Sequence, residues 1–229
     1  MEASRVREKK VVAWLEKVSK NASHIYLVGD VFDFWFEYKD VVPKGYTRLL
    51  GCLAKLSDAG IKITAFKGNH DMWMFGYFEE ELGIPVISDE LIVEHLGKKF
   101  YISHGDGIGP GDGKYKMLKK IFRSKICQRL FAFLHPAIGV GMANYFSSKS
   151  RMANGGFDKT YLGDENEWLL SFSKEYYKKN PIDYFVFGHR HLPLDLPVND
   201  KSRYINLGDW ISDFTYAEFD GNTMELKKF

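Results

Sequence analysis

The stretch HIYLVGD, residues 24–30, decides the fold prediction. It is a continuous apolar run that ends in Gly29-Asp30, which is typical of a buried strand in an α/β sheet. Three later stretches are built in the same way: IKITAFKGNHD (61–71), FYISHGD (100–106) and YFVFGHRH (184–191). Because ligands of open α/β sheets lie beyond the carboxyl ends of the strands, we expect the four endings to converge on one site.

The four endings carry side chains that bind metal ions. They supply one carboxylate from Asp30, the amide of Asn69, and imidazoles from four of the seven histidines, namely His70, His104, His189 and His191. This mixture of oxygen and nitrogen ligands suits Mn, Fe, Zn or Co better than Ca. Any one of these endings alone could be structural, but all four in this order favour a metal site.

Helices are expected between and after these strands. Apolar residues recur at helical spacing over 2–20, 46–59, 74–82, 114–134, 136–146 and 164–179, and short strands close the chain after residue 200. The order βαβα, then helices, then β predicts an α/β fold with layered sheets. We expect one domain over 1–229 with a helical insertion at 107–165.

Composition excludes several classes of protein. With 229 residues, 45% hydrophobic and 27% charged, the chain is long enough for one large domain with a real core, and general disorder is excluded. No run of 18 apolar residues predicts a membrane-spanning helix, and the first ten residues do not resemble a signal peptide. Two isolated cysteines, Cys52 and Cys127, favour a reducing, cytoplasmic compartment. A net charge of +2 without a basic, aromatic stripe argues against a nucleic-acid partner.

The strand endings resemble those of the calcineurin-like metallophosphoesterases. The matching strings are GD (29–30), GNHD (68–71), HGD (104–106) and GHRH (188–191). The resemblance implies a layered α/β/β/α sandwich and two divalent metal ions, most often Mn, with Fe, Zn or Co as alternatives. It further implies that Asp30 bridges the ions, that Asn69, His104 and His189 hold one of them and His191 helps to hold the other. His70 would act beside the scissile phosphate, with Asp71 orienting it.

One part of the family pattern is missing. The family opens with Asp-x-His on its first strand, and residues 1–24 contain no such string. Only Asp30 and His191 would remain for the second ion, which makes a weak site, and a sheet neighbour would be left unpaired. Our hypothesis is that Met1 is an internal methionine of a longer natural chain. The alternative is a metal-depleted homologue without catalytic activity.

The insertion at 107–165 bears on which kind of phosphoesterase the chain resembles. Aromatic residues follow the first metal string in GDVFDFWF (29–36), and the helices of the insertion are both apolar and basic. Such helices can lie in a membrane interface, line a hydrophobic tunnel, or simply pack on the sheets. An apolar groove leading to the metals would favour a lipid substrate, whereas helices packed flush would favour a water-soluble one.

These features are similar to those of the UDP-2,3-diacylglucosamine pyrophosphatase family. The resemblance implies hydrolysis of a lipid-linked nucleotide sugar to lipid X and UMP in lipid A biosynthesis, at the cytoplasmic face of the inner membrane with peripheral attachment. It implies substrate contacts from Asp112, Tyr115, Ser148 and Lys149. Because GNHD replaces the GNRD of many members, another calcineurin-like phosphodiesterase or phosphatase remains an alternative.

Overall fold

The computed structural model describes residues 2–109, 113–143, 145 and 160–229. The described helices are α1 (Glu2–Val18), α2 (Thr47–Asp58), α3 (Tyr77–Leu82), α4 (Gly113–Arg123), α5 (Lys125–Ala132), the 3-10 helix η1 (Asp164–Asn166) and α7 (Trp168–Tyr177). The described strands are β1 (His24–Leu27), β2 (Lys62–Phe66), β3 (Val86–Ile87), β4 (Glu90–His95), β5 (Lys98–Ser103), β6 (Tyr184–Phe187), β7 (Pro193–Asn199), β8 (Ser202–Leu207), β9 (Thr215–Phe219) and β10 (Met224–Lys228). Residues 136–143 and 145 are also helical.

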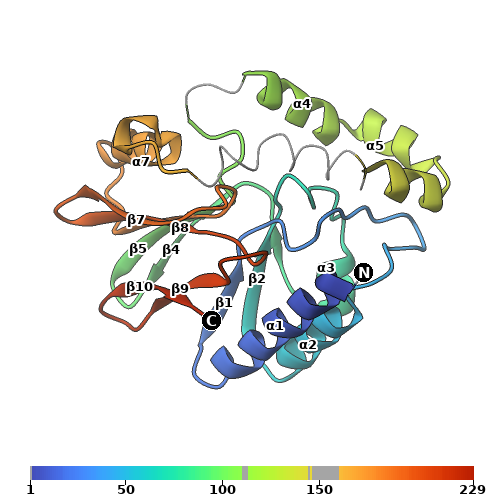
Figure 1. Cartoon of the computed structure of the whole chain (residues 1–229), viewed down its shortest axis with the longest axis horizontal. Helices are drawn as coiled ribbons and strands as arrows, with labels where there is room; N and C mark the ends of the chain where they lie inside the picture. Colours follow the sequence, from blue (N-terminus) through green and yellow to red (C-terminus); the bar gives the residue numbers. More distant parts are fainter. Residues whose placement is uncertain (1, 110–112, 144, 146–159) are drawn as a thin grey trace.

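The strands form two sheets and a hairpin. One sheet has the order β1-β2-β3 with parallel pairing, and the other has the order β4-β5-β6-β8-β7. In the second sheet β5, β6 and β8 run parallel, and the antiparallel strands β4 and β7 form its edges. The hairpin of β9 and β10 lies beside β1 (Figure 1).

Three hydrophobic clusters define the layers. The first joins α1, α2 and α3 to β1 and β2, with Trp35 and Leu53 fully buried at its centre. The second lies between the two sheets and contains Phe66 and Ile205. The third packs α7 on the other face of the five-stranded sheet. The layers therefore run helix, sheet, sheet, helix, and the predicted α/β/β/α fold is confirmed.

A side chain of helix α1 caps the N-terminus of α2. Tyr46, the residue before α2, provides no side-chain cap, so the first N–H groups of that helix need another acceptor. Glu8 supplies it, because its Oε1 accepts from the backbone N–H groups of Arg48 at 2.8 Å and Leu49 at 3.3 Å. A carboxylate at a helix N-terminus is also favoured by the helix dipole.

The helical insertion differs from its prediction. The helix expected over 114–134 is interrupted at Ser124, which lies in extended conformation between α4 and α5. The helix expected over 164–179 consists of η1 and α7. Strand β7 was not predicted, because Pro193 and Pro197 argue against a strand; the structure accommodates them at the edge of the sheet, where proline is tolerated.

Helices α4 and α5 lie across the end of the sheets where the parallel strands finish (Figure 1). They are held to the rest of the fold through Trp73, whose Nε1 donates to the carbonyl of Phe122 at 2.8 Å. The ring of Phe131 packs at 4.8 Å from that of Phe36 and at 4.7 Å from that of Trp73. Aromatic residues that follow the first and second metal strings therefore hold these helices in place.

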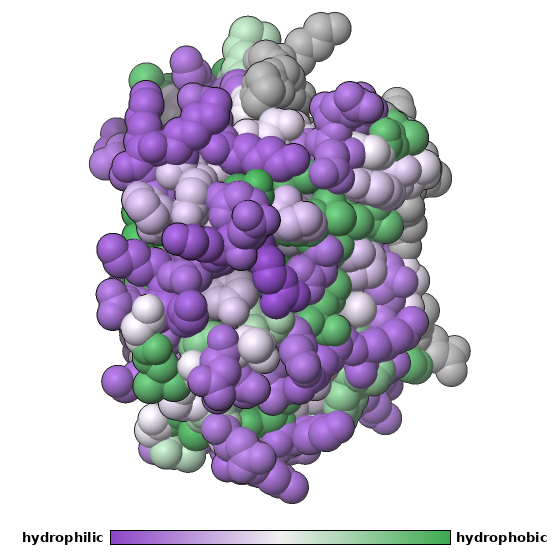
Figure 2. Space-filling model, turned by 90° about the vertical axis from the view of Figure 1, so that its left-hand side faces the viewer, coloured by the Kyte–Doolittle hydropathy of each residue, from purple (hydrophilic) through white to green (hydrophobic). Residues whose placement is uncertain are grey.

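The surface provides two further observations. The face seen in Figure 2 is mostly hydrophilic, with apolar side chains scattered over it. None of the described helices is both long and apolar enough to cross a membrane.

Candidate metal centre

The four strand endings meet at one edge of the sheets. Strands β1 and β2 run parallel in one sheet and β5 and β6 run parallel in the other, and the residues that follow these strands come together. Two of these residues adopt left-handed backbone conformations, Asp30 with φ 51° and His189 with φ 62°. Such conformations are costly outside glycine and are concentrated at functional sites.

Four donor atoms converge at this edge. Ligand atoms of Asp30, His104 and His189 all lie within 4.8 Å of one another. The Oδ1 atom of Asn69 lies 3.1 Å from His104 Nε2 and 2.9 Å from His189 Nδ1. One carboxylate, one amide oxygen and two imidazoles therefore surround a common point.

The orientation of His104 is fixed by the backbone. Its Nδ1 donates to the carbonyl oxygen of Val28 at 2.8 Å, since a carbonyl can only accept, and Nε2 is left facing Asp30 and Asn69. Gly29 makes this approach possible, because a Cβ at this position would lie 2.5 Å from His104 Nδ1. A hydrogen bond of this kind on the second ring nitrogen is the usual support of a metal-binding histidine.

Charges at the centre are strongly coupled. Burial disfavours the charged form of His104, but the carboxylate of Asp30 outweighs it and raises the pKa of His104 to about 9. Burial also disfavours ionised Asp30, and His104 reverses that effect and holds the pKa of Asp30 well below its usual range. Burial and the neighbouring His104 lower the pKa of His189 to about 4, so its imidazole is neutral and able to bind a cation.

Asp71 connects the loop after β1 with the loop after β2 through hydrogen bonds. Its carboxylate accepts from the backbone N–H groups of Gly68 at 2.6 Å and Val31 at 2.7 Å, and from that of Asp30 at 3.2 Å. Burial and the charge of Asp30 raise the pKa of Asp71 to about 7, whereas the donated N–H groups lower it. The side chain thus positions the loops that carry Asp30 and His70.

The remaining predicted residues are placed as follows. The backbone N–H of His70 donates to Asp30 Oδ1 at 2.8 Å, and both His70 and His191 line a cavity of about 1050 Å³ that opens at the centre. Tyr115 lies in α4, but its side chain is outside what the structure describes, and Asp112, Ser148 and Lys149 lie outside the described residues altogether.

The donor set fits a divalent transition metal ion. The Asp30 carboxylate and the Asn69 amide oxygen lie 3.3 and 3.1 Å from His104 Nε2, and the same amide oxygen lies 2.9 Å from His189 Nδ1; oxygen and imidazole donors at this spacing can surround one cation. The four donors are sufficient for one ion. His191 lines the same cavity.

Two supporting contacts could not be inferred from the motifs. Arg190, between the two histidines of GHRH, points away from the centre and forms a buried ion pair with Glu167 at 3.2 Å. Lys119 of α4 forms an ion pair with Asp106 of the HGD string at 2.6 Å. The first contact fixes the GHRH loop on α7, and the second fixes α4 on the HGD loop. In each pair the two residues lie in different elements and are not adjacent in sequence, so the spacing of the motifs could not predict these contacts.

We expect Arg190→Met to destabilise the fold by about 3–5 kcal/mol, because Glu167 would remain buried without a counter-charge. The double variant Arg190→Met with Glu167→Leu should recover much of this loss. Urea denaturation of both variants and the parent measures the difference. A loss below about 1 kcal/mol for the single variant would show that the pair is not supporting the loop.

Comparisons with known proteins show what this chain is similar to. The sequence model described as calcineurin-like phosphoesterase matches residues 7–193. A protein named UDP-2,3-diacylglucosamine hydrolase from Porphyromonas gingivalis is 41% identical over 96% of this chain and 88% of its own length. A protein of the same name from Yersinia pestis is 25% identical over 94% of this chain and 89% of its own. A solved structure of Vps29 from Entamoeba histolytica, complexed with zinc, covers 94% of this chain and 86% of its own at 11% identity and a TM-score of 0.41.

Proposed function

Because this chain belongs to the calcineurin-like phosphoesterase family, a family of metal-dependent hydrolases, we propose that it hydrolyses the pyrophosphate of UDP-2,3-diacylglucosamine. The observation that supports the reaction type is the convergence of Asp30, Asn69, His104 and His189 on one point. The observation that supports the substrate is the 41% identity, over nearly the whole chain, to a protein named for that activity.

The protein's part in the chemistry begins with holding the ions. Asp30, Asn69, His104 and His189 would hold one divalent ion, Mn being our proposal, and Asp30 with His191 would contribute to a second site. When bound, such ions polarise phosphoryl oxygens and make water a stronger nucleophile near neutral pH. Val28 and Asp71 keep the ligands in place through the hydrogen bonds described above.

His70 is positioned to meet the substrate. Its backbone N–H donates to Asp30 Oδ1 at 2.8 Å, and the residue lines the cavity beside the donor cluster. We assign to its imidazole a hydrogen bond to the phosphoryl oxygen on which negative charge develops. Asp71 acts on this step through the loop geometry, since it accepts N–H groups from both neighbouring loops.

The reaction that we propose needs no covalent enzyme intermediate. Water adds to the phosphorus next to uridine, and the bond from that phosphorus to the bridging oxygen breaks. UMP leaves with the oxygen of water, the bridging oxygen stays on the phosphate of the diacylated sugar, and a proton is released. The products are therefore UMP and a lipid monophosphate.

The helices of the insertion supply an apolar surface for this substrate. Several large side chains on them are exposed rather than packed: Met117, Leu118, Ile121, Ile126, Leu130, Phe133, Ile138 and Met142. Basic residues such as Arg123 and Arg129 lie on the same helices. We propose that this surface meets the acyl chains at the cytoplasmic face of the inner membrane, with peripheral attachment, and that Asp112, Tyr115, Ser148 and Lys149 contact the sugar phosphate.

We expect the double variant Ile126→Glu with Leu130→Glu to bind vesicles of phosphatidylglycerol at least 10-fold more weakly than the parent. Two exposed apolar contacts would be replaced by charges that anionic lipid repels. Vesicle sedimentation measures binding. Ile92→Glu, an equally apolar exposed position on β4, is the matched control and should bind as the parent does. Equal binding by the double variant and the parent would exclude this surface as the attachment site.

The experiment that tests the substrate compares two phosphate compounds. We expect UDP-2,3-diacylglucosamine with Mn²⁺ to be cleaved with a much higher kcat/KM than bis-p-nitrophenyl phosphate, a generic phosphodiester. A higher kcat/KM on bis-p-nitrophenyl phosphate would favour another phosphodiesterase or phosphatase of the same family. The GNHD string, which replaces the GNRD of many members, is consistent with that alternative. Absence of both activities together with no bound metal would favour a non-catalytic homologue.

A further inference from the structure

Two histidines outside the metal strings come together at the start of β1. Of the seven histidines in the chain, His24, His95 and His135 lie outside those strings. His24 begins β1 and His95 ends β4, so these two residues belong to different sheets. The metal centre is built from residues that follow the opposite end of β1, and the two histidines are therefore separate from it.

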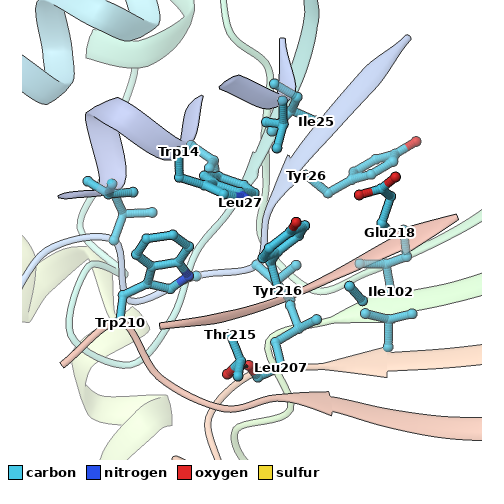
Figure 3. Close-up of a pocket in the computed structure, with 18 of the residues that line it drawn as sticks. Trp14, Ile25, Tyr26, Leu27, Ile102, Leu207, Trp210, Thr215, Tyr216 and Glu218 are labelled. Carbon is cyan, nitrogen blue, oxygen red and sulfur yellow. Dashed lines mark hydrogen bonds between the residues drawn. The ribbon is translucent and has the colours of Figure 1, made fainter. Parts of the chain in front are cut away.

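The hydroxyl group of Tyr26 lies between these two rings. Its oxygen is 2.8 Å from His95 Nε2 and 3.3 Å from His24 Nδ1. Tyr26 leaves β1 on the face opposite to Ile25 and Leu27, so its side chain points toward the second sheet, where β4 lies (Figure 3). We call His24, Tyr26 and His95 the His-Tyr-His cluster.

Ring contacts hold the three side chains in one arrangement. The rings of His24 and Tyr26 stack with 4.1 Å between their centroids, and the ring of His95 meets that of His24 edge-on at 5.9 Å. Phe100 of β5 packs edge-on against His95 at 5.6 Å. The donor atoms are therefore oriented before a ligand binds, which lowers the entropic cost of binding.

The second ring nitrogen of His24 is also fixed. Its Nε2 lies 2.9 Å from Oγ1 of Thr64, a buried residue of β2 that is the register partner of Tyr26. The hydroxyl oxygen of Thr64 can accept from Nε2–H, which directs the lone pair of Nδ1 at the Tyr26 oxygen. A hydrogen bond of this kind is the usual support of a metal-binding histidine. Burial lowers the pKa of His24, with contributions from His95 and Lys62, so its ring is neutral near neutral pH.

The spacing of the donor atoms fits a transition metal ion. Donors that share a tetrahedral ion at metal–ligand distances of about 2.0–2.1 Å lie about 3.3 Å apart, close to the two distances at the Tyr26 oxygen. Imidazole nitrogens suit Zn²⁺ and Cu²⁺, whereas Mn²⁺ is the weakest binder of the series. The three side chains are only partly buried, so water can complete the coordination.

From these observations we propose that the His-Tyr-His cluster is a further metal site, which binds Zn²⁺ or Cu²⁺ through His24 Nδ1, His95 Nε2 and the Tyr26 oxygen. The ion takes the place of the protons that lie between these atoms. When both rings are neutral, each ring keeps its proton on the outer nitrogen, and the hydroxyl proton of Tyr26 is released to solvent. The ion joins the three-stranded sheet to the five-stranded sheet and stabilises their packing.

The first test uses Cu²⁺, because phenolate bound to Cu²⁺ produces a charge-transfer absorption band in the visible range. We expect the full chain to show this band and to release one proton for each ion bound at the cluster. Tyr26→Phe should lose the band. Asp30→Asn should keep it, because none of the four donors of the metal centre is a phenol. This readout does not depend on hydrolase activity.

The second test measures Zn²⁺ affinity by calorimetry in the Asp30→Asn protein, in which the metal centre is impaired. Adding His95→Gln or Tyr26→Phe should weaken binding about 10-fold or more. Thr64→Val, which removes the acceptor for His24, should weaken it about 10-fold, and Thr64→Ser should restore it. His135→Gln is the matched histidine control and should have no effect. Zn²⁺ should raise Tm unless Tyr26 is replaced.

Four results would overturn the proposal. They are the absence of a charge-transfer band at saturating Cu²⁺, a band of equal strength in Tyr26→Phe, and equal Zn²⁺ affinity with and without His95→Gln. The fourth is loss of the band in Asp30→Asn, which would show that the cluster is not separate from the metal centre.

Discussion

Asp30→Asn should reduce kcat/KM on bis-p-nitrophenyl phosphate and on the lipid substrate on the order of 10³-fold, several kcal/mol of transition-state stabilisation. The carboxylate is the only anionic donor in the converging cluster of described residues, and the proposed second site also depends on it. An amide in its place removes the charge that attracts both ions. The variant should remain folded, because the amide oxygen still accepts from the backbone N–H of His70.

Asp40→Asn is the matched control, since this carboxyl group is exposed on the same segment and away from the donor cluster. Its kcat/KM should equal that of the parent. Metal content should fall in the Asp30 variant and remain unchanged in the control. Full activity of Asp30→Asn with parent metal content would remove Asp30 from the centre.

His70→Asn should lower kcat roughly 10²-fold while leaving metal content and KM close to those of the parent. The reason is that His70 lines the cavity beside the donors, and its backbone N–H donates to Asp30 Oδ1. The loss therefore belongs to the step in which charge develops on the phosphoryl oxygen. Steady-state rates measure the loss of kcat, and elemental analysis shows whether the metal content has changed.

The exposed histidine His135, between α5 and the next helical segment, offers the comparison for His70. On a water-soluble phosphodiester His135→Asn should match the parent. A loss of bound metal in His70→Asn equal to that in Asp30→Asn would identify His70 as a ligand and not as a partner of the phosphoryl group.

Much of the fold could be predicted because several of its parallel strands, such as β5 and β6, are largely buried on both sides. Continuous apolar runs such as those before Asp30 and His104 mark parallel strands, and strand ends in such sheets share one edge. Strand β7 was missed because Pro193 and Pro197 oppose a strand, and only the position at the sheet edge makes them acceptable. The interruption at Ser124 was missed because apolar residues continue at helical spacing on both sides of it.

The parts of the site that could not be predicted depend on distant partners. The ion pair of Arg190 with Glu167 and that of Lys119 with Asp106 join residues 23 and 13 positions apart through different elements. The hydrogen bond from His104 to the carbonyl of Val28 involves a backbone atom, on which residue type has no bearing. Sequence did indicate an unpaired sheet neighbour, but the cavity that lies beside β1 appears only in the fold.

The central claim is that the four strand endings form one metal-dependent centre that cleaves UDP-2,3-diacylglucosamine. The most direct measurement follows UMP release from this substrate by metal-free protein, before and after addition of Mn²⁺, with mass spectrometry of both products. We predict that UMP and the diacylated sugar monophosphate form together only after Mn²⁺ is added, and that Asp30→Asn abolishes the response. Release of UMP that is unaffected by chelator, or no release with Mn²⁺ bound, would contradict the account.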